Sequence, residues 1–460
     1  MSVAVCWFRR DLRLHDNAAL YHALRSGYPV LPLFVFDTHI LDDLNDRSDP
    51  RVGFIHRSLV EMRENLQKQG SGMLVLKGKP EEVWKDILAR FEVKKVFTNR
   101  DEEPYAIQRD LAVANLLGER NIPFHTSKDH VIFGHDEVLK SDGTPYTVFT
   151  PYKRRWLEKL QSRISSQPDE NGVSQPVSYF LKSYPTEKYF SNFIRKSSLT
   201  AEQASLTGGF PSLETLGFTP SDMAVPSAVV ARSLIRNYDQ TRNFPALDAT
   251  SKLGIHFRFG TISIREKARN ALVLNETYLS ELIWRDFYSQ ILANFPHVAT
   301  RSFRPEYDRI QWRNDPAEIE KWKAGKTGYP IVDAGMRQLN KTGYMHNRVR
   351  MITASFLTKH LLADWRIGEA WFAEKLLDFD LASNNGGWQW AAGCGTDAAP
   401  YFRIFNPTEQ NKKFDPEYKY VRKWVPEFGT PMYPRPVVDH AMARQRCLET
   451  YKAGLEKGKG

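Results

Sequence analysis

The chain has 460 residues, of which 42% are hydrophobic and 26% charged. This length suffices for two domains with full cores, and the near-average glycine and proline content excludes a disordered chain. The three cysteines, Cys6, Cys394 and Cys447, have no CxxC spacing, and no apolar run is long enough to span a bilayer. Because the N-terminus also lacks a signal-peptide pattern, we expect a soluble, cytoplasmic protein with reduced thiols.

The net charge of +10 arises entirely after residue 130, because the residues before it hold equal numbers of basic and acidic side chains. A positive balance confined to one part of a chain is typical of a surface that faces a polyanion. Solubility alone is the alternative, and charge by itself does not decide between the two.

Residues 1–130 alternate between strand-like and helix-like patterns. Apolar runs predict strands at 3–8, 30–36, 73–76 and 93–98, with a weaker one from Ile122. Longer stretches such as 51–69 and 81–91 are polar and periodic. Short strands that are apolar on both faces and separated by helices predict a doubly wound α/β domain with a parallel sheet. No G-x-G-x-x-G follows the first strand, so ordinary dinucleotide binding is not expected at that turn.

The rest of the chain changes character twice. Residues 131–220 are rich in Ser, Pro and Gly, which predicts a long extended connector. Helical periodicity dominates 221–460, with N-capping signals at Ser263 and at Ser280, and most of the tryptophans lie there. We therefore expect an α/β domain over 1–130, a connector over 131–220 and an all-α domain over 221–460.

One motif is misleading, and one class of site has no supporting motif. Residues 324–328, Ala-Gly-Lys-Thr-Gly, resemble the end of a phosphate-binding loop, but Glu320 stands where that loop needs glycine. A nucleoside triphosphatase is therefore excluded. The histidines show no HExxH or comparable spacing, so no metal site is predicted.

Chemistry-bearing residues concentrate between 281 and 406. In a helix, Glu281, Trp284, Arg285 and Tyr288 share one face, which could receive a planar, hydrogen-bonding ligand such as a base. The alternative is a Glu–Arg pair that brackets a core tryptophan, and this segment alone favours that alternative.

Two further segments repeat the pattern. Asn347, Arg350 and Met351 share a helical face that combines an amide, a guanidinium and a thioether. In 378–392 the glycines at 386 and 387 permit a ligand to approach the backbone. Trp388 and Trp390 cannot share a helical face, so one can meet a buried group while the other lines a mouth. A glycine-containing core turn is the alternative, and the three segments together argue against it.

Six motifs in this order resemble those of the photolyase/cryptochrome family, closest to its class I branch. They are residues 8–17 (FRRDLRLHDN), 250–253 (TSKL), Glu281-x-x-Trp284, 328–334 (GYPIVDA), 345–348 (MHNR) and 384–390 (NNGGWQW). The resemblance covers almost the whole chain. It implies an antenna-type N-terminal domain, a connector and a helical domain that binds FAD in a folded conformation.

The resemblance also implies which residues bind the flavin. Asn384 matches the residue that faces flavin N5, Asp378 and Asp380 match an acidic pair near the isoalloxazine and ribose, and Tyr278 lies where an aromatic packs near the adenine. Gly254 replaces a usual serine, which removes one hydroxyl contact. The expected flavin-binding residues are Tyr238, Thr250, Ser251, Lys252, Leu253, Gly254, Tyr278, Arg350, Asp378, Phe379, Asp380 and Asn384.

Asn384 also separates branches of the family. Repair enzymes carry Asn at this position, whereas many signalling cryptochromes carry Asp or Cys. A neutral amide can bond flavin N5 without offering an acid, which suits the reduced flavin that repair needs. The chain also ends about 50 residues after Asn406, without the long tail of the signalling kind. Both points favour repair.

The lesion pocket implies the substrate. Relatives that act on (6-4) photoproducts place two histidines where this chain has Asn347 and Met351, so splitting of cyclobutane pyrimidine dimers by excited, reduced FAD is expected. The lesion must flip out of the duplex to reach the pocket. Glu281, Asn347 and Asn384 are the expected catalytic residues. The expected lesion and DNA contacts are Arg242, Trp284, Arg285, Tyr288, Asn347, Arg348, Met351, Trp390, Arg403 and Gln410.

Two further implications concern light and electrons. Asp101 and Arg258 match an acid–base pair found in deazaflavin-binding members, while Tyr105 and Ala106 replace a folate-binding Asn and Glu, so a deazaflavin antenna, or none, is expected. Trp312, Trp365 and Trp388 match a chain that carries electrons to the flavin, although three core tryptophans would look the same.

UV-damaged DNA is the expected partner, and the protein is expected to be monomeric. A photoreceptor that signals through a partner, or a non-enzymatic DNA-binding flavoprotein, are the alternatives that Asn384 and the complete pocket set argue against.

Overall fold

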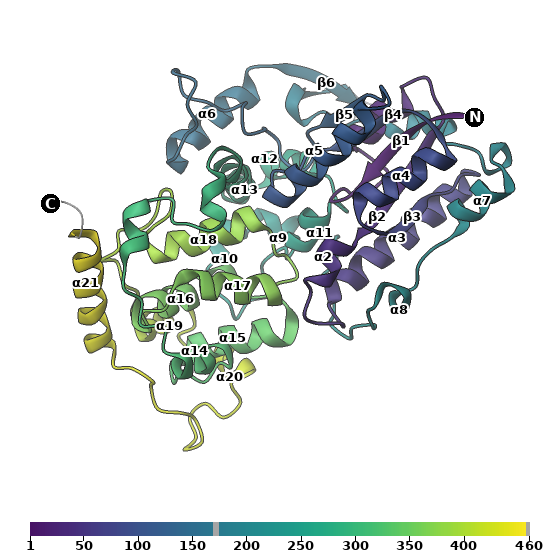
Figure 1. Cartoon of the computed structure of the whole chain (residues 1–460). Helices are drawn as coiled ribbons and strands as arrows, with labels where there is room; N and C mark the ends of the chain where they lie inside the picture. Colours follow the sequence, from purple (N-terminus) through teal and green to yellow (C-terminus); the bar gives the residue numbers. More distant parts are fainter. Residues whose placement is uncertain (169–173, 457–460) are drawn as a thin grey trace. The chain divides into compact units, whose positions relative to one another are not determined.

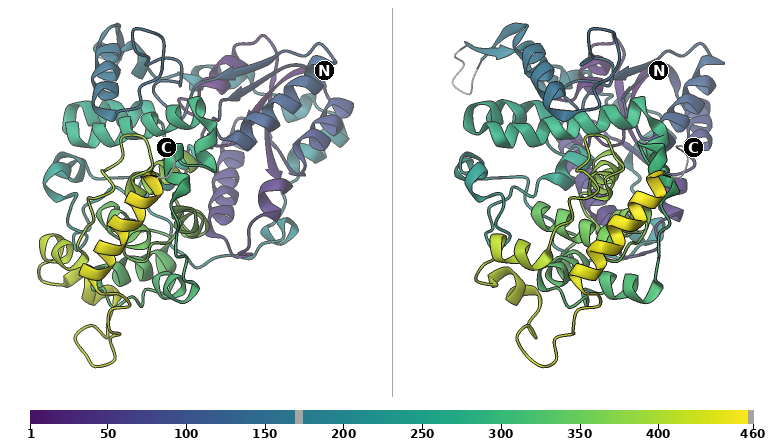
Figure 2. Two further views of the ribbon diagram at one scale, coloured as in Figure 1. Left: turned by 60° about the vertical axis from the view of Figure 1, so that its left-hand side comes forward. Right: turned by 90° about the vertical axis from the view of Figure 1, so that its left-hand side faces the viewer.

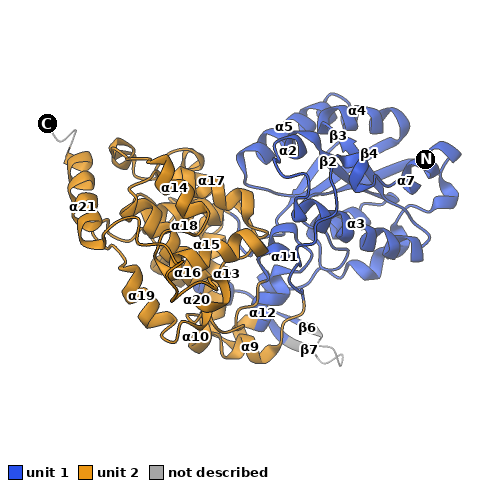
Figure 3. Ribbon diagram, turned by 90° about the horizontal axis from the view of Figure 1, so that it is seen from below, with its two compact units in different colours: residues 1–134, 157–228, 253–270 blue, residues 135–156, 229–252, 271–460 orange. Residues whose placement is uncertain are grey.

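The computed structural model describes residues 1–168 and 174–456 (Figure 1). The chain divides into two compact units, each assembled from separated stretches (Figure 3). Unit 1 comprises residues 1–134, 157–228 and 253–270, and unit 2 comprises 135–156, 229–252 and 271–460.

Unit 1 is built on a parallel sheet with the strand order β3-β2-β1-β4-β5. Its strands are β1 (Ser2–Phe8), β2 (Val30–Asp37), β3 (Leu74–Gly78), β4 (Glu92–Asn99) and β5 (Phe124–Ser127). In the central strand Val5 pairs with Leu31 on one side and Val96 on the other. Each strand falls on an apolar run of the sequence, to within about two residues.

Alternate residues of β1 face opposite sides of the sheet. Ala4, Cys6 and Phe8 pack in one cluster with α1 (Ala18–Leu24) and α3 (Pro50–Lys68). Val3, Val5 and Trp7 pack in a second cluster with α4 (Pro80–Arg90) and α5 (Pro104–Gly118). Because helices cover both faces, the central strands β1 and β2 are buried along almost their whole length, and the predicted doubly wound α/β fold is confirmed.

The connector segment contains regular elements of its own. It follows β5 and begins with α6 (Phe149–Gln161) and an antiparallel hairpin of β6 (Ile164–Pro168) and β7 (Ser174–Ser178). The short helices α7 (Ala201–Gly208) and α8 (Leu213–Leu216) follow. Residues 169–173 of this segment lie outside the described residues. One further short helix, α2 (Thr38–Asp42), lies in the sheet region after β2.

Beyond residue 230 the described chain is helical, as the sequence predicts. The helices are α9 (Arg232–Arg236), α10 (Tyr238–Thr241), α11 (Gly254–Phe259), α12 (Ile264–Leu274), α13 (Glu276–Asn294), α14 (Pro316–Lys323), α15 (Pro330–Thr342), α16 (Asn347–Ser355), α17 (Trp365–Lys375), α18 (Leu381–Ala392), α19 (Pro407–Phe414), α20 (Lys419–Trp424) and α21 (His440–Glu456). A π-helical turn, Phe356–His360, follows α16 directly.

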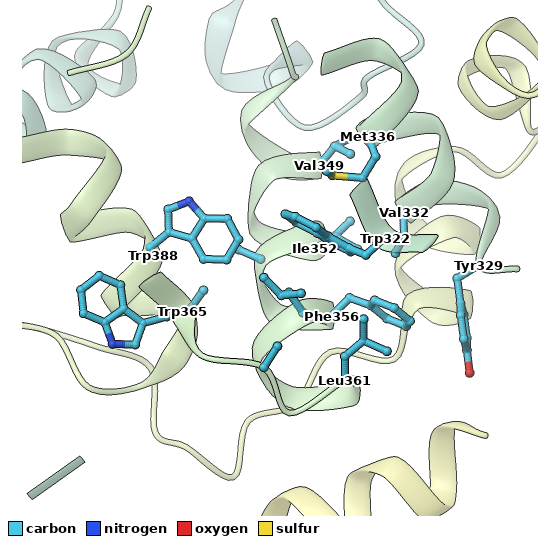
Figure 4. Packing of buried hydrophobic residues seen from close by; sticks show 14 of the residues in the cluster. Trp322, Tyr329, Val332, Met336, Val349, Ile352, Phe356, Leu361, Trp365 and Trp388 are labelled. Atoms are coloured by element: carbon cyan, nitrogen blue, oxygen red, sulfur yellow. The ribbon is translucent and has the colours of Figure 1, made fainter. Parts of the chain in front are cut away.

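The core of unit 2 is aromatic at its centre. Trp322, Phe356, Trp365 and Trp388 are buried in one cluster with aliphatic residues of α15 and α16 (Figure 4). The last helix, α21, yellow in Figure 2, packs against the π-helical turn. Among residues 1–168 and 174–456, no helix has the length and hydropathy that a bilayer crossing requires.

Candidate active site in the helical unit

A cavity of about 420 Å³ lies within unit 2. Its walls come from α13, α16, α17 and α18, and from the segment that enters α18. The lining residues are Arg242, Glu281, Trp284, Arg285, Tyr288, Asn347, Arg350, Met351, Ala354, Phe372, Leu376, Asp378, Phe379, Asp380, Ser383, Asn384, Gly387, Trp388 and Trp390. The three sequence segments that predict a ligand site therefore meet at one cavity.

Helix α13 contributes the face predicted from its spacing. Glu281, Trp284, Arg285 and Tyr288 all line the cavity. The helix begins at Glu276, four residues before the predicted cap, because Asn275 rather than Ser280 accepts the backbone N–H of Tyr278 at 3.0 Å. An asparagine N-cap satisfies one of the free amides of the first turn as well as a serine does.

The Trp284 ring is held by a residue that the sequence does not point to. Phe149, at the start of α6, stacks on it with the ring centroids 3.7 Å apart and the planes 7° from parallel. This contact fixes the orientation of Trp284 in the cavity wall. Phe149 lies in the predicted connector, where no periodicity distinguishes it.

Helix α16 presents Asn347, Arg350 and Met351 to the cavity, as its spacing predicts. Its N-cap is His346, whose Nδ1 accepts the amide of Arg348 at 3.2 Å. Burial, with Arg350 as the next cause, lowers the pKa of His346 to about 4, so the ring is neutral at pH 7. A neutral imidazole keeps the lone pair that capping requires.

Arg350 joins α16 to the segment before α18. Its Nη2 donates to both carboxylate oxygens of Asp378, at 2.9 and 3.1 Å, and its Nε donates to the backbone oxygen of Met345 at 2.7 Å. Burial opposes the charge of Arg350, but Asp378 outweighs it and raises the pKa of the guanidinium. The guanidinium of Arg350 therefore balances the charge of the Asp378 carboxylate and fixes its position in the cavity wall.

Helix α18 is capped by Asp380, whose side chain accepts the amide of Ser383 at 3.2 Å. Its two glycines have different surroundings. A Cβ on Gly386 would lie 2.2 Å from the Tyr288 ring, so this glycine allows close helix packing, whereas a Cβ on Gly387 would meet nothing within 4 Å. Gly387 lines the cavity, which leaves the backbone there open to a ligand.

Asn384 is fixed by a partner that no sequence motif indicates. Its side-chain nitrogen donates to the backbone oxygen of Glu369 at 3.1 Å and to the carboxyl of Glu369 at 2.8 Å. Burial raises the pKa of Glu369, and the bond from Asn384 works against that rise. Since the donors of the amide are used, its oxygen remains as the group that can accept a hydrogen bond in the cavity.

The residues expected near the flavin phosphates and adenine form a cluster of aromatic rings and hydroxyls. Tyr238 and Tyr278 meet edge to face with centroids 5.2 Å apart, and Tyr278 donates to the Ser251 hydroxyl at 3.1 Å. Thr250 shares a hydrogen bond of 2.8 Å with the Tyr344 hydroxyl.

The next three expected flavin-binding residues are Lys252, Leu253 and Gly254. Lys252 has a positive φ of 52° and pairs with Asp248 at 2.5 Å. Leu253 caps α11 and Gly254 is its first residue, and both belong to unit 1.

The three predicted electron-transfer tryptophans lie in unit 2. Trp388 and Trp365 are both buried in the core cluster of unit 2 (Figure 4), while Trp312 is half-buried and packs against the same cluster. Trp388 packs so closely against α17 that a Cβ on Gly368 would lie 2.0 Å from its ring. This arrangement is compatible with a relay that ends near the surface, and also with a purely structural role.

The predicted DNA-backbone arginines differ in their surroundings. Arg242 pairs with Glu281 at 2.6 Å, Arg348 donates to Asn243 at 2.7 Å, and Arg403 is exposed. Burial lowers the pKa of Arg348, and Arg242 and Arg403 lower it further, so each of these two cations lies close enough to Arg348 to repel it. Gln410 is half-buried on α19.

Of the predicted antenna pair, Asp101 follows the carboxyl end of β4 and Arg258 lies on α11, both in unit 1. Arg10 donates to Asp101 at 2.9 Å and to Glu103 at 3.1 Å, and Arg258 donates to Glu103. Burial raises the pKa of Asp101, but Arg10 and its neighbours outweigh that effect and lower it. The hollow that Asp101 lines has a volume of about 10 Å³, room for about one water molecule.

Comparison with known proteins agrees with this fold and site. A family model described as DNA photolyase matches residues 4–171, and one described as the FAD binding domain of DNA photolyase matches residues 278–431. The deoxyribodipyrimidine photo-lyase of Escherichia coli is 37% identical, with all of both chains covered.

Solved structures give the same picture. A class III photolyase of Agrobacterium tumefaciens matches with a TM-score of 0.80 and 31% identity, covering 99% of this chain and 98% of that one. A cryptochrome of Synechocystis also matches with a TM-score of 0.80, at 25% identity, covering 98% of this chain and 99% of that one.

A parallel-sheet unit combined with a helical unit that carries this cavity defines the class of FAD-binding photolyases and cryptochromes. The chain belongs to the DNA photolyase family. It is an enzyme of the lyase class with an FAD-binding domain, and its family acts in DNA repair.

Proposed function

We propose that the protein repairs cyclobutane pyrimidine dimers in DNA with light, by electron transfer from excited, reduced FAD to a flipped-out lesion. The observation that carries the proposal is that Glu281, Trp284, Asn347, Met351 and Trp390 line the same cavity as Asp378, Asp380 and Asn384. The first set supplies hydrogen bonds and apolar walls for two linked pyrimidine bases, and the second supplies polar contacts for a flavin.

The side chains of the cavity suit FAD. Asn384 keeps a free oxygen acceptor because Glu369 binds its donors, Arg350 and Asp378 form a fixed charge pair, and Gly387 leaves backbone open. We assign Asn384 to flavin N5 and Asp378 and Asp380 to the ring and ribose. Bound FAD, once reduced and excited, would supply the electron that splits the dimer.

The choice of lesion rests on Asn347 and Met351. Neither side chain can deliver a proton, which the transfer of oxygen in a (6-4) photoproduct needs, whereas a cyclobutane dimer needs only an electron and its return. Glu281 and Asn347 would hold the carbonyls of the dimer, and Trp284 and Trp390 would provide apolar walls. The cationic cluster of Arg242, Arg348 and Arg403, together with Gln410, would bind the DNA backbone.

The test measures the loss of dimers from irradiated oligonucleotides in blue light and in the dark. The readout is the recovery of thymine absorbance. We expect light-dependent recovery with cyclobutane dimers and none with (6-4) photoproducts. Light-dependent repair of (6-4) products would overturn the substrate assignment. Flavin photochemistry without repair of either lesion would favour the signalling alternative, to which the similarity to a cryptochrome also points.

Glu281→Ala is the matching variant. The lesion carbonyls would lose a carboxyl hydrogen bond of about 1–3 kcal/mol, so repair should weaken. Glu276→Ala, on the same helix but exposed and paired with Lys153, should repair normally. Equal repair by both variants would remove Glu281 from the mechanism.

An antenna pigment is a separate question. The hollow that Asp101 lines has a volume of about 10 Å³, and Arg10 pairs with Asp101 in its wall. This hollow is too small for a three-ring chromophore, so we propose that Asp101 does not hold a deazaflavin antenna. If added 8-hydroxy-deazaflavin produced a band in the excitation spectrum for repair, the proposal would be wrong.

A further inference from the structure

The carboxyl group of Glu281 and the guanidinium of Arg242 form an ion pair in the cavity wall. Nη1 of Arg242 lies 2.6 Å from Oε1 of Glu281, and the two side chains are 24% and 30% exposed. Arg242 follows α10 directly, and Glu281 lies on α13. Because both side chains line the cavity, a ligand that enters it can reach either member of the pair.

The surroundings of Arg242 contain more positive than negative charge. Arg242 and Arg403 both lie near enough to Arg348 to lower its pKa. Arg348 donates to the Asn243 amide and to the Met351 sulfur, which are neutral. Glu281 is the one carboxylate that forms an ion pair with this cluster in the part of the chain that the structure describes. A DNA phosphate would therefore compete with Glu281 for Arg242, and arginine binds phosphate at least as well as carboxylate.

Loss of Arg242 would change the state of Glu281. Burial raises the pKa of this carboxyl, and Arg242 is the charged group that counteracts the rise. The other titratable groups around it are the hydroxyls of Tyr238, Tyr278 and Tyr288, whose pKa values burial raises, so they stay neutral. On α16, His346 is neutral at pH 7 and Arg350 is neutralised by Asp378.

Arg285 lies on the same helix and lines the same wall. Arg242 forms the ion pair with Glu281 and lowers its pKa against the effect of burial. With Arg242 withdrawn, that opposing effect is lost, and burial favours the neutral acid.

We propose that a phosphate of the bound DNA takes Arg242 from Glu281, and that the released carboxylate then takes up one proton from solvent. The resulting O–H can donate to a lesion carbonyl, whereas a carboxylate can only accept. It also removes a negative charge from the place where the lesion would receive an electron. This inference rests on the proposed function, because it needs the lesion in the cavity. No bond other than the new O–H forms, and release of DNA returns the proton.

The experiment is calorimetry of the flavin-loaded protein with an oligonucleotide carrying one thymine dimer. Titrations run at one pH in two buffers with different heats of ionisation, and are repeated from pH 5.5 to 8. We expect the observed heat to depend on the buffer, with uptake of up to one proton. The affinity should fall as pH rises, by up to tenfold per pH unit in the window between the free and bound pKa of Glu281.

Three variants test the assignment. Glu281→Gln should bind with the same heat in both buffers. Arg242→Gln should also bind with little proton uptake, because Glu281 is already neutral in the free protein. Glu276→Gln, a carboxyl on the same helix that pairs with Lys153 at the surface, should behave as the wild type.

The outcomes separate the two proposals. Selective binding and light-dependent repair of the dimer, with equal heats in both buffers, would overturn the proton uptake and leave the proposed function intact. Uptake that persists in Glu281→Gln would assign the proton to another group and would also overturn it. Equal affinity for damaged and undamaged DNA without repair would instead refute the proposed function.

Discussion

The side-chain amide of Asn384 donates both to the backbone oxygen and to the carboxyl of Glu369, at 3.1 and 2.8 Å. The two residues come from neighbouring helices, α18 and α17, and both are partly buried. The contact fixes which atom of Asn384 is available to a ligand, because an amide whose nitrogen is occupied can only accept. It also makes this position sensitive to a change that is small in shape but large in charge.

Asn384→Asp should destabilise the flavin-loaded protein by about 1–3 kcal/mol at pH 8, because two carboxylates would then lie within hydrogen-bond distance. The deficit should shrink at pH 5. The pair can share a proton there, and a carboxyl whose folded pKa is raised favours the folded state at low pH. The measurement is the melting temperature at both pH values. Adding Glu369→Gln to Asn384→Asp should make the loss of stability the same at pH 8 and pH 5. An equal loss at both pH values in the single variant Asn384→Asp would contradict the reasoning.

Gly368→Ala should lower the free energy of unfolding by about 1–3 kcal/mol, although alanine is the better helix former. The added Cβ would lie 2.0 Å from the Trp388 ring and 2.6 Å from Leu357, so the tryptophan must move. Denaturant unfolding measures the loss. Gly387→Ala on α18 is the matched control, since its Cβ meets nothing within 4 Å. That variant should keep or gain stability but retain less flavin, because the methyl group enters the cavity.

Trp312→Phe should leave flavin content and melting temperature nearly unchanged, because most of the packing volume is kept. If Trp312 is the outer end of an electron relay, light and an external reductant should then fail to reduce the flavin efficiently. Protein that has been reduced chemically should still repair DNA, because the repair electron passes from flavin to lesion. Normal photoreduction in this variant would show that Trp312 is structural.

Arg403→Ala should reduce the slope of log affinity against log salt for damaged DNA by about 0.9, since one phosphate contact is lost. Arg403 is exposed. Arg366→Ala is the control, because Asp308 and Asp364 already pair with Arg366, at 2.6 and 3.0 Å. Equal slopes for Arg403→Ala and the wild type would remove Arg403 from the phosphate contacts.

Lys359→Met should stabilise the protein near pH 7. Lys359 is buried, donates to the backbone oxygen of Ala392 at 2.8 Å and lies 3.8 Å above the Tyr451 ring. Burial lowers its pKa to about 8, so the unfolded chain binds this proton more tightly than the folded protein. The cost that the buried, charged Lys359 imposes on the free energy of unfolding is complete below about pH 8 and disappears towards pH 10.5.

The advantage of Lys359→Met in unfolding free energy should therefore decline over that pH range, by up to roughly 3 kcal/mol. Paired denaturant titrations at pH 7 and pH 10 measure it. A constant difference between the two proteins would contradict the buried, titrating lysine.

Much of the site was predictable from the sequence because helical spacing is a local property. The period of 3.6 residues places Glu281, Trp284, Arg285 and Tyr288 on one side of α13, and these residues do line the cavity together. The parallel sheet was predictable for a similar reason, since runs apolar on both faces have no stable place outside a covered sheet. The beginning of α13 was less certain, because Asn275 and Ser280 are both good caps and only the fold chooses between them.

What the sequence by itself determined is therefore the kind of residue that each element offers, and the family whose motifs those residues make. The tertiary structure decided which distant residues meet: Phe149 on Trp284, Glu369 on Asn384, and Arg242 on Glu281. No local period links such pairs, because they come from separate elements whose contact depends on the packing of the whole unit. They nevertheless set the orientation and charge of the groups in the cavity, since a buried polar group is fixed by its hydrogen-bond partner.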